Sequence, residues 1–178
     1  MYGMVHRAAR QMVLDQQGPE IWRDMTLAVG LTDEHFIGTH VYSDELTLRI
    51  VGQIAQTSGC SMTEALESFG EYWIGFAYAG SYSAIMRMAG DNLHQFLGNL
   101  DRMHASLQVS VAGARLPTFE VTSSTPSDIQ LIYRSEREGL QPFVKGLMQG
   151  LLKHFSLSGS VEVGERHNEG VDVLIRLA

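Results

Sequence analysis

The spacing of apolar residues divides the chain into a helical part and a part in which apolar and polar residues alternate. Through most of the first two-thirds, apolar side chains recur every three or four residues, as they do on a helix with one buried face. Glycine, proline and serine mark the ends of these segments, and Ser61 with Glu64 has the pattern of a capping box. The spacing predicts helices over residues 4–17, 19–29, 44–58, 61–77, 81–88 and 91–111.

After Gly113 the pattern changes to alternation, which is typical of strands with one buried face. It predicts strands over residues 116–121, 129–137, 161–163 and 171–177, a helix over residues 142–155, and turns over residues 122–128 and 166–170. We therefore expect an α+β protein whose C-terminal third is an antiparallel sheet with helices packed on it.

The composition indicates one soluble domain and argues against several classes of function. The 178 residues are 44% hydrophobic, enough to bury a core without disulfides, and Cys60 is the only cysteine, as in proteins of a reducing compartment. The formal net charge is −7 with only 13 Lys and Arg residues, so we expect no binding to nucleic acid or to an anionic membrane surface. The start has no signal-peptide core and no apolar run approaches membrane-spanning length, so we expect a cytoplasmic protein.

The sequence contains none of the common catalytic motifs, but one histidine stands out by its position. None of the seven histidines has the spacing of a zinc site, and no phosphate-binding glycine loop occurs. His104, however, lies on the apolar face of the helix predicted over residues 91–111, four residues after Leu100. It is either a core histidine hydrogen-bonded to the backbone or, since a haem needs a single imidazole, an axial ligand to haem iron.

A second candidate feature is the Y-x-S-x-R pattern formed by Tyr133, Ser135 and Arg137. On the strand predicted there, the three side chains project from one face over about 13 Å. Arginine binds a carboxylate through two parallel N–H bonds, and the two hydroxyls can donate to a second oxygen, so the set suits a ligand with two carboxylates. The alternative is a polar strand end at the solvent edge. Together with His104, the pattern supplies both requirements of a haem site, one for the iron and one for the propionates.

Several stretches of the chain resemble one family. They are residues 1–8 (MYGMVHRA), 69–73 (FGEYW), 99–107 (NLDRMHASL), 116–120 (LPTFE) and 133–137 (YRSER). In these stretches, and in the upstream position of His104 relative to the Y-x-S-x-R motif, the chain is similar over essentially its whole length to the H-NOX family. These are the haem nitric oxide/oxygen-binding domains related to the haem domain of soluble guanylate cyclase.

The resemblance implies a cofactor, a set of site residues and a fold. The cofactor is haem b, and the residues implied are His104 as the proximal iron ligand, Tyr133, Ser135 and Arg137 on the propionates, and Pro117 pressing on the porphyrin. The fold implied is a single domain of two lobes with the haem between them, at approximately residues 1–62 and 63–178. The N-terminal lobe is helical, and the C-terminal lobe combines helices with a four-stranded antiparallel sheet.

The resemblance also bears on the gaseous ligand. Members of the family that hold O2 use a distal tyrosine on the helix after the Y-x-S-x-R strand, and that place falls here at Pro142 or Phe143, which donate no side-chain hydrogen bond. Bound O2 carries negative charge and gains about 1.5–3 kcal/mol from a donor, whereas NO depends far less on one. The other residues expected on this side are Met1, Val5, Trp73, Ala77 and Leu147. We therefore expect a sensor that binds NO, and also CO, but excludes O2 at ambient levels, unless the Trp73 indole N–H points at the iron.

The family further implies a mechanism and a partner. NO weakens or breaks the bond between iron and His104, and the N-terminal lobe then shifts. No kinase or cyclase fits in 178 residues, so we expect no enzyme activity and a signal passed to a separate protein such as a histidine kinase or a cyclic-di-GMP enzyme. Two alternatives stay open: a module that binds a tetrapyrrole or another dicarboxylate without iron, and a haem enzyme, which would need distal acid–base groups.

Overall fold

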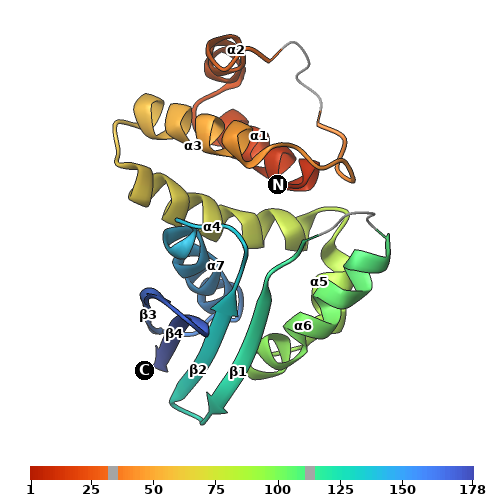
Figure 1. Cartoon of the computed structure of the whole chain (residues 1–178), viewed down its shortest axis with the longest axis vertical. Helices are drawn as coiled ribbons and strands as arrows, with labels where there is room; N and C mark the ends of the chain where they lie inside the picture. The colour runs from red at the N-terminus through yellow and green to blue at the C-terminus, as the bar shows by residue number, and fades with distance from the viewer. Residues whose placement is uncertain (32–35, 111–114) are drawn as a thin grey trace.

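The computed structural model describes residues 1–31, 36–110 and 115–178, which form seven helices and one four-stranded antiparallel sheet (Figure 1). The helices are α1 (Gly3–Gln16), α2 (Pro19–Ala28), α3 (Asp44–Ser58), α4 (Met62–Ala79), α5 (Ser83–Ala89), α6 (Leu93–Ser110) and α7 (Gln141–His154). The strands are β1 (Thr118–Ser124), β2 (Asp128–Arg134), β3 (Gly159–His167) and β4 (Gly170–Leu177). The predicted α+β class is confirmed. The sequence-based boundary positions Val111 and Gly113 lie outside the described residues. Within those residues, no helix combines the length and the apolar character needed to cross a bilayer.

Local side-chain contacts explain why the helices begin and end where they do. At the start of α3, the Ser43 hydroxyl accepts the Leu46 N–H at 3.2 Å. Helix α4 starts with the predicted capping box: Ser61 accepts the Glu64 N–H at 3.2 Å, and Glu64 accepts the Ser61 N–H at 2.8 Å. Between them Gly59 adopts a left-handed conformation with φ of 65°, which stops α3 and turns the chain back along it.

The sheet has the strand order β1-β2-β4-β3, and two strand boundaries differ from the prediction. Strand β1 continues through Ser124, although this polar segment was expected to be a turn. The pairing register with β2 shifts at a bulge between Val121 and Ser123. Strand β1 lies at the edge of the sheet, where polar side chains can face solvent. At the other end, the last pair of β1 and β2 is Thr118 with Arg134, because the preceding Pro117 has no N–H to extend the ladder.

The prediction that one strand carries Tyr133, Ser135 and Arg137 is therefore wrong for the last two residues, which follow the end of β2. The final hairpin also differs from the prediction. Strand β3 extends to His167 and β4 begins at Gly170, so the turn is shorter than residues 166–170.

Two clusters of buried apolar side chains form the core, and α4 contributes to both. One cluster joins α1, α2 and α3 with Phe69 and the beginning of α4. The other joins the sheet to α5, α6 and α7 and takes in Ile74 and Ala77 near the end of α4. Trp73 packs against both clusters. In Figure 1, the first three helices lie on one side of α4, while α7 and the sheet lie on the other.

Helices α4 and α7 approach each other closely enough that only glycine fits at the contact. A Cβ placed on Gly70 would lie 2.2 Å from the carbonyl oxygen of Phe143, and one on Gly146 would lie 2.0 Å from that of Glu67. Ion pairs flank the contact, with Lys145 to Glu67 at 3.0 Å. The close approach fixes the beginning of α7, and with it Phe143, relative to α4.

A histidine is buried in the N-terminal cluster and held there in its neutral form. The His6 side chain is 1% exposed, its Nε2 lies 2.9 Å from the Thr47 hydroxyl, and its ring stacks on Phe36 at 4.7 Å between centroids. Burial, with a smaller contribution from the amino terminus, lowers its pKa from 6.5 to about 4. This imidazole therefore stabilises the fold only while it is uncharged.

We expect acid to destabilise the protein through His6. Because the pKa is lower in the folded state, the unfolded chain binds the proton first, and stability falls as the pH drops from 6.5 towards 4. At pH 5 the loss is about 2 kcal/mol. Urea unfolding of the wild type and of His6→Gln between pH 7.5 and 4.5 measures it: the variant should be less stable at pH 7.5 but lose less on acidification. Parallel pH profiles for the two proteins would contradict the assignment.

Candidate functional site

A large cavity lies where the two core clusters meet. Its volume is about 1120 Å³, including space open to solvent. Side chains from α1, α4, α5, α6, α7 and the first two strands line it, and most of them are apolar. A cavity of this size and character suits a large, flat, largely apolar ligand.

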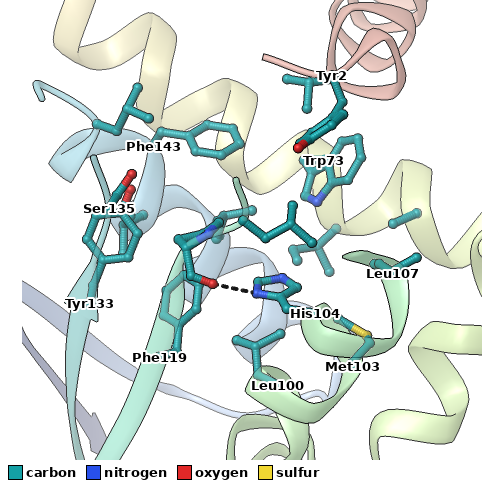
Figure 2. A pocket seen from close by; sticks show the side chains of 18 of the residues that line it. Tyr2, Trp73, Leu100, Met103, His104, Leu107, Phe119, Tyr133, Ser135 and Phe143 are labelled. Carbon is teal, nitrogen blue, oxygen red and sulfur yellow. Dashed lines mark hydrogen bonds between the residues drawn. The ribbon is translucent and has the colours of Figure 1, made fainter. Parts of the chain in front are cut away.

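His104 lines this cavity from α6 and is oriented by the backbone of the β1 entry. Its Nδ1 lies 2.9 Å from the carbonyl oxygen of Pro117, as the dashed line in Figure 2 shows. A carbonyl only accepts hydrogen bonds, so Nδ1 carries the proton. Burial lowers the pKa of His104, although the Pro117 hydrogen bond and the charge of Asp101 act in the opposite direction. The ring is therefore neutral at pH 7, and its Nε2 keeps a free lone pair, as a metal ligand requires.

Asp101, which the sequence analysis did not single out, fixes the acceptor of this hydrogen bond. Its carboxylate on α6 accepts the N–H of Phe119 at 2.6 Å, while His104, three residues along the helix, donates to Pro117. The two bonds run in opposite directions between α6 and the same short segment. They hold that segment, and so the orientation of the imidazole, in one position. The i, i+3 spacing on the helix was the available signal.

Tyr133, Ser135 and Arg137 also line the cavity, at the end of β2 and just after it. Burial raises the pKa of Tyr133, so its hydroxyl stays protonated and can donate. Ser135 accepts the backbone N–H of Arg137 at 3.1 Å, which bends the chain after the strand. Figure 2 shows Tyr133 and Ser135 side by side, across the cavity from Trp73. The three predicted residues thus meet at the cavity because the chain turns after β2, and not because they alternate along one strand.

The residues predicted for the opposite side lie on the cavity wall, and the structure adds others. Of the two candidates at the start of α7, Phe143 lines the cavity, and Pro142 does not belong to the described lining. Sequence-predicted lining residues that the structure also brings to the cavity are Met1, Val5, Trp73, Ala77, Leu147 and Pro117. Tyr2 and Tyr82 were missed, and Tyr2 is 4% exposed. In Figure 2 the Trp73 nitrogen and the Tyr2 hydroxyl face the space between Phe143 and His104, so this wall carries polar atoms beyond the expected indole.

The donor set fits a haem. An apolar cavity presents one neutral imidazole with a free Nε2, and at one edge it presents two hydroxyls and a guanidinium. A single histidine suffices for haem iron, and the polar edge matches two carboxylates. The fold and the cavity are therefore those expected of a haem-binding domain, with His104 as the candidate ligand.

The comparison with known families agrees with that class. The model of the haem-NO-binding family matches residues 2–163, so the chain belongs to this family of haem-binding gas-sensor domains.

Similar curated proteins are soluble guanylate cyclases. Soluble guanylate cyclase gcy-35 of Caenorhabditis elegans is 28% identical over 182 residues, covering 98% of this chain and 26% of that protein. Guanylate cyclase soluble subunit beta-2 of Rattus norvegicus is 34% identical over 94 residues, covering 53% of this chain and 14% of that protein. The chain spans about a quarter of the length of the first of these relatives.

Solved H-NOX structures share the fold. An H-NOX protein from S. oneidensis in the Fe(II)NO ligation state has a TM-score of 0.88 at 19% identity, covering 100% of this chain and 99% of that one. An oxygen complex of an H-NOX domain related to soluble guanylate cyclases has a TM-score of 0.83 at 22% identity, covering 99% and 95%. The implied four-stranded sheet and α+β architecture are thus confirmed.

Proposed function

We propose that the chain is a haem b sensor that responds to NO and does not take up O2 in air. The observation that carries the proposal is the placement of Phe143 on the cavity wall opposite His104, where a side chain without a hydrogen-bond donor faces the ligand space (Figure 2). CO, which like NO depends little on a donor, is expected to bind as well. The apolar Phe143 side chain favours ligands that need no donor.

Each part of the cavity has a role in holding the cofactor. His104 offers its Nε2 to the iron, and the Pro117 carbonyl keeps the ring in the required tautomer and orientation. Tyr133, Ser135 and Arg137 donate to the propionates. The ring of Pro117 also lines the cavity, and its rigidity makes it a fixed contact for the face of the porphyrin.

The response to NO is proposed to begin at His104. Bound haem would supply an iron able to take up NO, and His104 would hold that iron through a bond that NO weakens. On release, His104 remains tied to Pro117 through Nδ1, so the imidazole can disengage without leaving its place on α6. We propose that two lobes, at approximately residues 1–62 and 63–178, then change their relative position. The cavity between the two core clusters supports a division into two lobes, and the N-terminal cluster also takes in Phe69 and the beginning of α4.

The signal is proposed to pass to a separate partner protein. A histidine kinase or a cyclic-di-GMP enzyme is the kind of partner we expect, in the cytoplasm, and the domain itself is proposed to catalyse no reaction. The guanylate cyclases that the chain resembles are about four times longer than the matched region, which supports a sensor role for this part. To measure the coupling, the haem-loaded chain is co-purified with such a kinase. The amount of kinase recovered in the presence of NO is compared with the amount recovered in its absence.

A second candidate function is O2 binding, and one observation favours it. The indole nitrogen of Trp73 and the hydroxyl of Tyr2 both face the ligand space (Figure 2), and none of the hydrogen bonds among the described residues uses either group. A donor aimed at bound O2 contributes about 1.5–3 kcal/mol, which is roughly ten- to more than a hundred-fold in affinity. Loss of O2 uptake in Trp73→Phe or Tyr2→Phe would identify the donor.

The absorbance of the ferrous protein distinguishes the two candidates. For the NO sensor, we expect an unchanged spectrum in air and a shifted Soret band once NO is added. Phe143→Tyr places a hydroxyl where the wall lacks one and should raise O2 affinity by roughly ten- to a hundred-fold, while the control Phe143→Leu should not. Stable O2 uptake by the wild-type protein in air would overturn the NO-selective proposal.

A further inference from the structure

Arg137, one of the proposed propionate ligands, is held by a carboxylate from the other half of the molecule. Its Nε donates to Asp44 Oδ1 at 2.9 Å, and its Nη1 donates to the carbonyl oxygen of Arg115 at 3.0 Å. Asp44 is the first residue of α3, whereas Arg137 follows β2, so 93 residues separate the partners along the chain. In this ion pair the Arg137 side chain is 15% exposed and the Asp44 side chain is 51% exposed. Solvent therefore screens the arginine less than the aspartate.

These two bonds determine which N–H groups of Arg137 can reach the cavity. A guanidinium has five N–H donors in a rigid plane. With Nε turned to Asp44 and one Nη1 donor turned to Arg115, the two Nη2 donors have no partner among the described hydrogen bonds, and Arg137 lines the cavity. Arg166 donates to the carbonyl oxygens of Ser135 and Arg137 at 2.9 and 2.7 Å, so the backbone that carries the guanidinium is also fixed.

We propose that Asp44 is a positioning residue of the haem site: it turns the Arg137 guanidinium so that its Nη2 edge meets a propionate, and it ties that edge of the site to α3. The inference rests on the proposed function, because it concerns how haem is retained. It also adds a residue to the site that the Y-x-S-x-R motif does not contain. The Asp44 carboxylate accepts a further bond from the Met1 amino group at 2.6 Å, so its own position is defined from two sides.

The alternative is that Asp44 only competes with the propionate for Arg137. Both are carboxylates, and a negative charge near the propionate is unfavourable by itself. The two possibilities predict opposite signs, because removing a competitor slows haem loss whereas removing a positioning group accelerates it. The sign of the change in haem loss therefore decides between them.

The test is the rate at which the haem-loaded protein gives up haem to excess apomyoglobin. We expect Asp44→Asn to accelerate haem loss about ten-fold, the scale seen when an outer-sphere partner of a ligand is removed. The matched control is Glu45→Gln, which removes the same charge one residue along α3 from a side chain that makes no described ion pair. Its rate should stay within about two-fold of the wild type, since an exposed charge interacts weakly.

A double variant separates positioning from a general effect on the fold. If Asp44 acts through Arg137, then Asp44→Asn combined with Arg137→Gln should lose haem no faster than Arg137→Gln alone. Additive effects, or a rate for Asp44→Asn equal to or below that of Glu45→Gln, would overturn the inference. If Asp44→Asn fails to fold, Asp44→Glu replaces it, with the same lack of additivity expected. A wild-type protein that takes up no haem would instead refute the proposed function itself.

Discussion

Replacing His104 by glycine is expected to remove the iron ligand and with it the Soret band of a histidine-ligated haem. The cavity offers one imidazole with a free Nε2, so haem content per chain should fall by about an order of magnitude in the variant. Added imidazole should restore the band, since glycine leaves a space in which the free base can bind. Absorbance of protein expressed with haem supply, titrated with imidazole, measures both effects.

The matched control for this experiment is His94→Gly on the same helix. His94 bonds to Ser124 and is outside the described cavity lining, so its replacement carries the cost of a helical glycine without touching the site. Full retention of the Soret band in His104→Gly would exclude this histidine as the ligand. A band that disappears in both variants would indicate unfolding of α6. Binding of a tetrapyrrole without iron to both variants would favour the alternative of a non-iron binding module.

Replacing Gly146 by alanine is expected to cause a large loss of stability. The added Cβ would lie 2.0 Å from the carbonyl oxygen of Glu67, an atom of the α4 backbone that cannot move without moving the helix. Overpacking against backbone lies at the upper end of the usual cost of overpacking, about 3 kcal/mol. For a chain of this length that corresponds to a fall in Tm of roughly 10 °C. Thermal melts and urea unfolding followed by circular dichroism measure the change.

Gly75 provides the control on α4 itself. A Cβ there would meet nothing within 4 Å, so Gly75→Ala relieves the entropic cost of a helical glycine and should stabilise the protein by about 0.5–1 kcal/mol. Opposite signs at the two positions would confirm that space, and not helix propensity, decides the outcome. A mild effect of Gly146→Ala would mean that α4 and α7 can separate.

Apolar spacing was sufficient to predict the helices, because each buries one face and each end has a local signal. The capping box at Ser61 and the stop at Gly59 are signals of that kind, and both are present in the structure. The strand ends were harder to predict. The bulge after Val121 and the end of β2 at Arg134 depend on what the neighbouring strand offers, which alternation within one strand does not encode. The strand order β1-β2-β4-β3 could not be predicted either, because alternation within a strand does not show which strands are neighbours.

The site could be predicted as far as single residues with distinctive chemistry. His104 stood out as an imidazole on an apolar face, and Tyr133, Ser135 and Arg137 stood out through their spacing and the family resemblance. Asp101 and Asp44 act through other residues, at 2.6 and 2.9 Å from their partners, and such pairings exist only once the chain has folded. Tyr2 was missed because it precedes the first helix, so apolar periodicity does not indicate that its side chain lines the cavity.

The backbone contact between α4 and α7 limits how the ligand preference of this domain can be redesigned. A Cβ added to Gly70 would lie 2.2 Å from the Phe143 carbonyl oxygen, so the contact between these helices has no room for a larger side chain. A mutant library that seeks a wider or differently shaped chamber should therefore leave this pair of helices intact. It should vary side chains contributed by α1 and α5, where the wall is built from Val5, Ile85 and Met86.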